Sequence, residues 1–69
     1  MREWLLELRT GKGLTQKQMA DKLDISEAYY SYIEKGERQK NMDISLVSKL
    51  STIFGIPVQK IVDLENGAA

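Results

Sequence analysis

The sequence predicts an all-α protein, a compact five-helix bundle, and three observations support this fold class. Apolar residues recur at helical spacing along most of the 69 residues, and no stretch of convincing length alternates as a strand would. Helix-capping residues precede the apolar segments, and glycines follow them. Because repeats, linkers and low-complexity tracts are absent, we expect one domain over residues 1–65 and a short flexible tail over residues 66–69.

The first two helices are expected at about residues 2–10 and from Thr15 onward. The apolar stripe of the first helix comprises Met1, Trp4, Leu5 and Leu8. Gly11 and Gly13 end this helix, as glycines commonly do. The second helix opens with the sequence TQKQ, a capping box in which Thr15 accepts from the amide of Gln18. Its inward positions are Met19, Ala20 and Leu23.

The third helix is expected over residues 27–34, with Ser26 as its N-cap and Gly36 as its end. At about 100° per residue, its tyrosines point in different directions. The inward face comprises Tyr30 and Ile33, with Glu34 at its border. Tyr29 lies on the flank. The outward face carries Ala28, Ser31, Tyr32 and Lys35. Small residues and hydrogen-bond donors on this outer face suit it to enter a groove, so the second and third helices are typical of a helix-turn-helix.

The fourth and fifth helices complete the bundle. Asp43 is a good N-cap for the fourth, and Gly55 ends it. Its apolar residues Ile44, Val47, Leu50 and Phe54 repeat at the 3.6-residue spacing of a helix. Pro57 suits the first turn of the fifth helix, which extends to about residue 64. The apolar side of that helix comprises Val58, Ile61 and Val62.

The composition excludes several classes of function. With no cysteine and no histidine, the chain lacks the usual general base, thiol nucleophile and nitrogen or sulfur metal ligands. Glu3 and Glu7 lie one helical turn apart, a spacing that any exposed helix face shows. So short a chain also has little room for a substrate pocket of the typical ~300 Å3 or more. We therefore expect a binding module rather than an enzyme, with no cofactor and no metal.

Positive charge is clustered although the net charge is zero. Residues 9–22 carry a charge of +3 and residues 35–40 a charge of +2, whereas the chain after residue 40 carries −1. A surface that binds phosphates depends on such local clustering and not on the total.

A spaced set of residues adds a resemblance to these patterns. It comprises Leu5, Leu8, Arg9, Gly13, Leu14, Thr15, Gln16, Met19, Ala20, Leu23, Ile25, Ser26, Tyr30, Ser31, Ile33, Glu34, Gly36, Leu50, Phe54, Gly55 and Ile56. Residues 5–62 thereby resemble the lambda-repressor/Cro-like helix-turn-helix family, also called the xenobiotic-response-element type. Asp24 occupies the turn position where the family usually has glycine, and aspartate tolerates such backbone angles.

The resemblance implies three groups of functional residues. Positions that reach base edges in the major groove are Ser26, Glu27, Ala28 and Tyr32. Positions that contact DNA phosphates are Thr15, Gln16, Tyr29, Lys35, Arg38 and Lys40. Arg9 and Glu34 match a partly buried ion pair between the first and third helices.

The same residue types also have simpler structural explanations, which stay open. Gln16 suits the second position of a capping box, and Glu27 suits the first turn of a helix because the helix dipole favours an acid there. Tyr29 can pack along the second helix, and Tyr32 can be an ordinary surface residue. The cations at positions 35, 38 and 40 can be solvated charges.

These expectations add up to a sequence-specific regulator of transcription that binds double-stranded DNA. We expect a cytoplasmic repressor, nucleoid-associated when bound, that reads a palindromic operator as a symmetric dimer. The homodimer is expected to use the fifth helix and the segment before it, around Val58, Ile61, Val62 and Leu64. No apolar run approaches the roughly 20 residues of a membrane span. Two alternatives remain, an antitoxin that also binds a toxin and a protein-interaction module without DNA binding.

Overall fold

The computed structural model describes residues 1–36 and 42–67, and this part of the chain contains five helices and no strand. The helices are α1 (Glu3–Gly11), α2 (Gln16–Leu23), α3 (Glu27–Lys35), α4 (Ile44–Phe54) and α5 (Val58–Glu65). The predicted all-α, five-helix fold is therefore confirmed.

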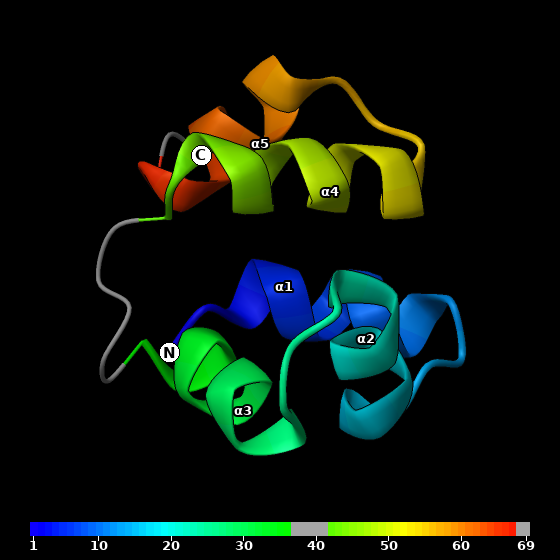
Figure 1. The fold of residues 1–69 in the computed structure, drawn as a ribbon. Coiled ribbons are helices and arrows are strands. Elements are labelled where there is room, and N and C mark those ends of the chain that lie inside the picture. The colour runs from blue at the N-terminus through cyan, green and yellow to red at the C-terminus, as the bar shows by residue number, and fades with distance from the viewer. Residues whose placement is uncertain (37–41, 68–69) are drawn as a thin grey trace.

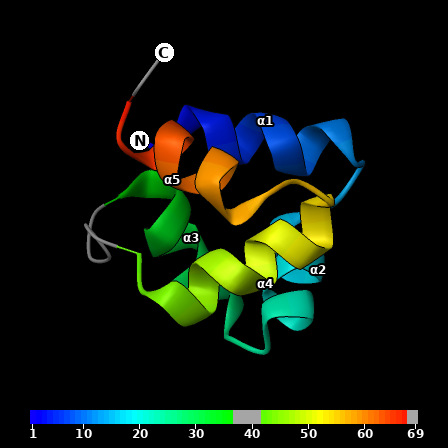
Figure 2. The same ribbon diagram turned by 90° about the horizontal axis from the view of Figure 1, so that it is seen from above.

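The helices form two layers (Figure 1). α1, α2 and α3 make one layer, and α4 and α5 lie across it. Seen from above, α4 crosses the α2–α3 pair while α5 lies beside α1 (Figure 2). α2 packs against both α3 and α4, and α4 packs against α5. The expected helix-turn-helix is thus supported from one side by the second layer.

Side chains cap the helices as the sequence predicts. At the start of α2, Thr15 Oγ1 accepts from the Gln18 amide at 3.1 Å, and the Gln18 side chain accepts from the Thr15 amide at 2.8 Å. Without such a reciprocal bond, Ser26 caps α3 by accepting from the Tyr29 amide, and Asp43 caps α4 by accepting from the Leu46 amide. Pro57 differs slightly from the prediction, because it is the N-cap of α5 and the helix begins one residue later.

α2 ends at a residue in the left-handed backbone conformation. Asp24 has φ 60° and ψ 44°, the backbone conformation that favours glycine, and the amide of Ile25 donates to the carbonyl of Ala20 at 3.0 Å. The aspartate therefore tolerates the turn, as expected. Gly36 ends α3 with φ 73°.

Every helix contributes to one buried core. Its members are Leu5, Met19, Ala20, Leu23, Tyr30, Ile33, Val47, Leu50, Phe54 and Ile61. Tyr30 is fully buried, whereas Tyr29 is 40% exposed, so the predicted directions of these two rings are confirmed.

Three apolar residues of the predicted helical stripes are exposed. Met1 is 72% exposed because α1 begins only at Glu3. Ile44 is 77% exposed because it lies roughly 90° around α4 from the mean direction of its buried residues. Val58, the first residue of α5, is 37% exposed.

Candidate nucleic-acid interface

α3 turns one face to the core and leaves the start of the helix open. Ser26, Glu27 and Ala28 are all exposed, and Lys35 at the other end of the helix is exposed as well. Tyr32 is only partly exposed, so its ring is less accessible than the sequence predicted. The predicted base-reading positions therefore form one exposed turn with a partly covered tyrosine beyond it.

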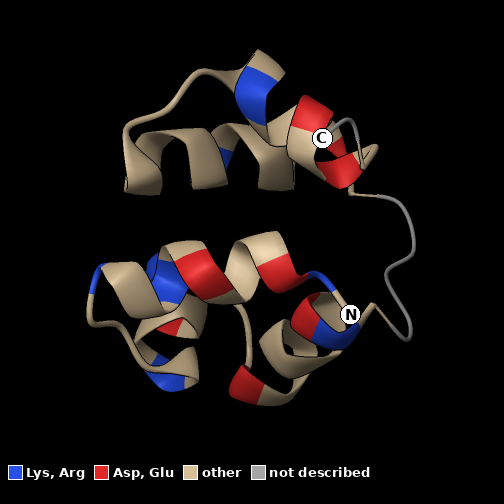
Figure 3. Ribbon diagram, turned by 180° about the vertical axis from the view of Figure 1, so that it is seen from behind, with Lys and Arg blue, Asp and Glu red and all other residues tan. Residues whose placement is uncertain are grey.

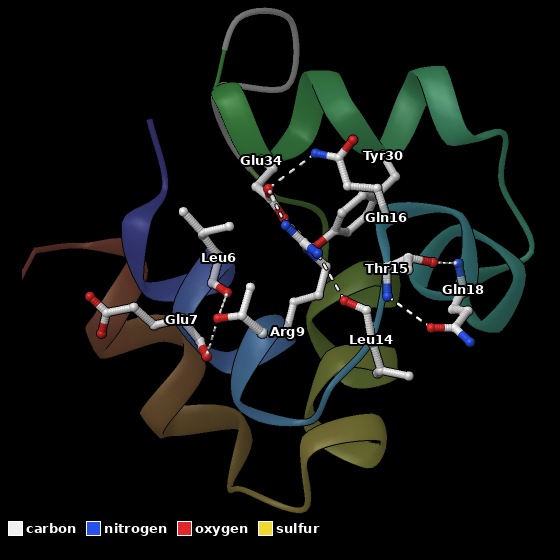
Figure 4. Close-up of polar contacts among 10 residues, drawn as sticks. Leu6, Glu7, Arg9, Leu14, Thr15, Gln16, Gln18, Tyr30 and Glu34 are labelled. Carbon is white, nitrogen blue, oxygen red and sulfur yellow. Dashed lines mark hydrogen bonds and ion pairs between the residues drawn. The ribbon is translucent and has the colours of Figure 1, made fainter.

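Glu34, on the inward face of α3, is 1% exposed and is the centre of a buried polar network. Arg9 Nε donates to Glu34 Oε2 at 2.9 Å and Arg9 Nη2 donates to Glu34 Oε1 at 3.2 Å, which makes a bidentate ion pair between α1 and α3 (Figure 4). The Tyr30 hydroxyl donates to Glu34 Oε2 at 2.7 Å. Arg9 Nη1 also donates to the carbonyl of Leu14, just before α2. This carboxylate therefore lies deeper than the border position expected for it.

Gln16 joins the same network from the first position of α2. Its Nε2 donates to Glu34 Oε1 at 3.1 Å (Figure 4). We name the four residues Arg9, Gln16, Tyr30 and Glu34 the Glu34 network. It fixes α1, the start of α2 and the second half of α3 to one another, and sequence reasoning did not foresee the contact of Gln16.

The charge states in the Glu34 network reinforce one another. Burial acts to raise the pKa of Glu34, but hydrogen bonds from Arg9, Tyr30 and Gln16 outweigh it and hold that pKa below its usual value. Burial and the adjacent carboxylate raise the pKa of Tyr30 above that of a free phenol. The hydrogen bond to Glu34 raises the pKa of Arg9. At neutral pH the network therefore holds an anion, a cation and a neutral phenol.

The phosphate-contacting positions lie at both ends of the α2–α3 pair. Thr15 is exposed and Gln16 is half-buried at the start of α2, whereas Tyr29 and Lys35 are exposed on α3. Arg38 and Lys40 lie outside the described residues. Figure 3 shows basic and acidic segments interspersed along α1, α2 and α3, and an almost uncharged α4.

Arg2 is a buried residue that sequence reasoning missed. It is 7% exposed, and its guanidinium forms an ion pair with Glu65 at the end of α5, with Nη2 and Oε2 2.6 Å apart. Nothing in a single sequence signals this contact, because the two residues are 63 positions apart.

Two hollows open on the surface of the described residues. A hollow of about 100 Å3 lies between α2, α3 and α4, and a wider one of about 270 Å3 lies beside Lys22 and Thr52. Within residues 1–36 and 42–67, no three His, Cys, Asp or Glu side chains are arranged to hold a metal ion. None of the helices described is long and apolar enough to cross a bilayer.

Known proteins share this sequence pattern. A sequence model of helix-turn-helix domains matches residues 5–61. An uncharacterised HTH-type transcriptional regulator, YqaF of Bacillus subtilis (strain 168), is 42% identical over 45 residues, which are 65% of this chain and 59% of that protein. The HTH-type transcriptional activator BcrR of Enterococcus faecalis is 35% identical over 64 residues, which are 93% of this chain and 30% of that protein. No solved structure gives a significant match.

The chain thus spans less than two thirds of the length of either relative. The family match extends from α1 into α5 and includes the whole α2–α3 pair, whose second helix exposes its first turn. The match covers most of the chain, and the five helices have the architecture that it requires. The chain therefore belongs to the Cro/C1-type helix-turn-helix family of DNA-binding transcriptional regulators.

Proposed function

We propose that the protein binds specific double-stranded DNA sequences by inserting α3 into the major groove. The observation that carries this proposal is the asymmetry of α3. Its inward residues are held by the core and by the Glu34 network, while its first turn is open to solvent. A helix held so firmly presents its outer side chains in a fixed orientation, which base-specific hydrogen bonds require.

The exposed turn offers chemistry for reading bases. The oxygen of Ser26 already accepts from the Tyr29 amide at 3.1 Å, so its hydroxyl proton remains free to donate to a base acceptor. Glu27 is suited to accept from the amino group of cytosine, and Ala28 to contact the methyl group of thymine. Tyr32 adds a hydroxyl further along the helix.

Phosphates would anchor the protein on either side of that groove. At the start of α2, Gln16 uses one amide hydrogen for Glu34 and has a second available for a phosphate oxygen. The helix N-terminus there favours an anion. The hydroxyl of Thr15, the phenol of Tyr29 and the ammonium of Lys35 complete the anchor among the described residues.

A symmetric dimer would place two such helices on a palindromic operator. Ile61 is fully buried in the core of one chain, so it is excluded from the interface expected for it. Val58 is 37% exposed, and Val62 and Leu64 are half-buried. Val58 and Val62 lie about 40° apart around α5 and form the proposed dimer surface, whereas Leu64 lies on the other side of the buried Ile61. Repression would follow where the occupied operator overlaps a site that the transcription machinery needs.

Selection from random duplex DNA tests this function. We expect the purified 69-residue chain to enrich an inverted repeat whose half-sites are centred about 10–10.5 base pairs apart, or a multiple of that distance. Enrichment of a single half-site would contradict dimer formation but not DNA binding by α3. No enrichment, together with binding that does not weaken as salt rises, would favour a protein-interaction module instead.

A further inference from the structure

Arg2 lies where three helices meet. It is the N-cap residue of α1, and its backbone amide donates to the carbonyl of Glu34 at 2.8 Å. Its Nη1 donates to the carbonyl of Ile33 at 2.5 Å. Both carbonyls belong to the end of α3. Figure 1 shows the N-terminus of the chain beside the end of α3, and Figure 2 shows it near the end of α5.

The other side of the same guanidinium binds α5. Nε donates to Glu65 Oε1 at 2.8 Å, and Nη2 donates to Glu65 Oε2 at 2.6 Å. This planar, bidentate geometry fixes the angle between the two side chains as well as the distance between them. Glu65 is the last residue of α5, where the helix dipole disfavours an acid, and Arg2 offsets that charge.

The Arg2 side chain therefore connects α3 to α5, two helices that have different roles in the proposed function. α3 carries the proposed reading turn, and α5 carries the proposed dimer surface of Val58 and Val62. In a symmetric dimer, the angle between these helices within one chain determines how far apart the two reading helices stand. A small rotation in each chain is doubled across the two-fold axis.

We propose that Arg2 is a positioning residue that, through its ion pair with Glu65, sets the half-site spacing that the dimer accepts. This inference rests on the proposed function, namely on reading by α3 and dimerisation through α5. Arg2 itself touches no DNA in this arrangement. It acts by holding α5 at a fixed angle to α3.

Two variants separate positioning from folding. Glu65→Gln removes the charge on α5 but leaves Arg2 its bonds to the end of α3. Arg2→Lys keeps the charge and loses the planar fork. The control is Lys49→Met. Lys49 Nζ donates to the carbonyl of Leu23 at the end of α2, so it also binds a helix end but joins α4 to α2.

The measurement is affinity for palindromes whose spacers are lengthened or shortened by one or two base pairs, and for a duplex with one half-site. We expect the wild-type protein and Lys49→Met to lose about tenfold or more in affinity for the altered spacers. For Glu65→Gln and Arg2→Lys we expect losses within about threefold, with half-site affinity unchanged within about twofold. That outcome would support positioning, because a purely structural role would weaken half-site and palindrome alike.

Two results would overturn the inference without touching the proposed function. One is a spacing preference in Glu65→Gln identical to that of the wild-type protein. The other is equal weakening on every duplex, in step with a lower Tm. If the wild-type protein binds DNA selectively but ignores spacing, dimerisation through α5 and this inference both fail. If it selects no sequence, the proposed function fails.

Discussion

The side-chain amide of Gln16 donates a hydrogen bond of 3.1 Å to Oε1 of Glu34, a carboxylate that is 1% exposed. The same carboxylate accepts from Arg9 and from the hydroxyl of Tyr30. The residue proposed to hold a phosphate at the start of α2 is thus bonded to the buried ion pair between α1 and α3. One carboxylate therefore links the core to the residue proposed to hold a phosphate.

A double-mutant cycle measures the coupling free energy between Arg9 and Glu34. We expect Arg9→Met and Glu34→Gln each to lower the free energy of unfolding by about 3–5 kcal/mol, because each leaves a buried charge without its partner. The double variant should lose less than the sum, by on the order of 1–3 kcal/mol. Urea unfolding at neutral pH gives the free energy of unfolding of the wild-type protein, the two single variants and the double variant.

An exposed pair in α5 provides the control for this cycle. Gln59 Nε2 donates to Asp63 Oδ1 at 2.9 Å within one helix, and Gln59→Ala with Asp63→Ala should couple by only about 0.2–0.5 kcal/mol. Additive losses for Arg9 and Glu34 would show that the bidentate contact contributes nothing beyond its separate partners.

The lowered pKa of Glu34 predicts a specific sensitivity to acid. Its pKa is held below the unfolded value of about 4.3, so the stabilisation is present above that pH and is lost as the pH falls through the folded pKa. Glu34→Gln should be less stable at pH 7 and should lose less stability between pH ~5 and the acid limit. Glu7→Gln, at an exposed position of α1, is the control and should follow the wild-type curve. Parallel curves for Glu34→Gln and wild type would contradict the assignment.

The helices were predictable because their signals are local. Thr15, Ser26 and Asp43 each cap a helix by bonding an amide three residues ahead, and that spacing is visible in the sequence. Tyr30 was correctly placed in the core because its face follows from helical periodicity alone. The same reasoning failed for Ile44, since periodicity gives the relative directions of side chains but not where the rest of the bundle ends.

The interface was less predictable because its supports are not local. Arg2 and Glu65 are 63 residues apart, and neither belongs to a motif. The bond from Gln16 to Glu34 also joins two helices, and a capping-box position gives no hint of it. Roles that the resemblance implies for Arg38 and Lys40 fall outside the described residues and stay predictions.

The exposed turn of α3 predicts which substitutions alter sequence preference. Ala28→Lys should change the selected bases while the free energy of unfolding stays within about 0.5 kcal/mol, because the residue is exposed. Tyr32→Phe is preferable to Tyr32→Ala, since Tyr32 is half-buried and the phenylalanine keeps its packing. Each reading contact should contribute roughly 1–3 kcal/mol of discrimination. Repeating the selection with each variant measures this, and recovery of the wild-type operator by Tyr32→Phe would remove that hydroxyl from the set of readers.

Salt dependence separates phosphate contacts from base contacts. Phosphates are alike at every step of a duplex, so Lys35→Ala should weaken binding to operator and scrambled DNA together. Because each neutralised phosphate releases counterions, the slope of log affinity against log salt should fall by about one unit. Gln16→Ala should weaken both DNAs with little change in slope, since a neutral amide displaces no counterion.

Lys60 is the better control cation for this experiment. It is exposed on α5, whereas Lys49 bonds to the carbonyl of Leu23 and its removal would also disturb packing. Lys60→Ala should leave both affinities and the slope unchanged, because α5 faces away from the proposed groove. A wild-type slope near zero would reject phosphate anchoring altogether. If Lys60→Ala lowered the slope as much as Lys35→Ala, the DNA would have to lie along a different face, and docking through α3 would be wrong.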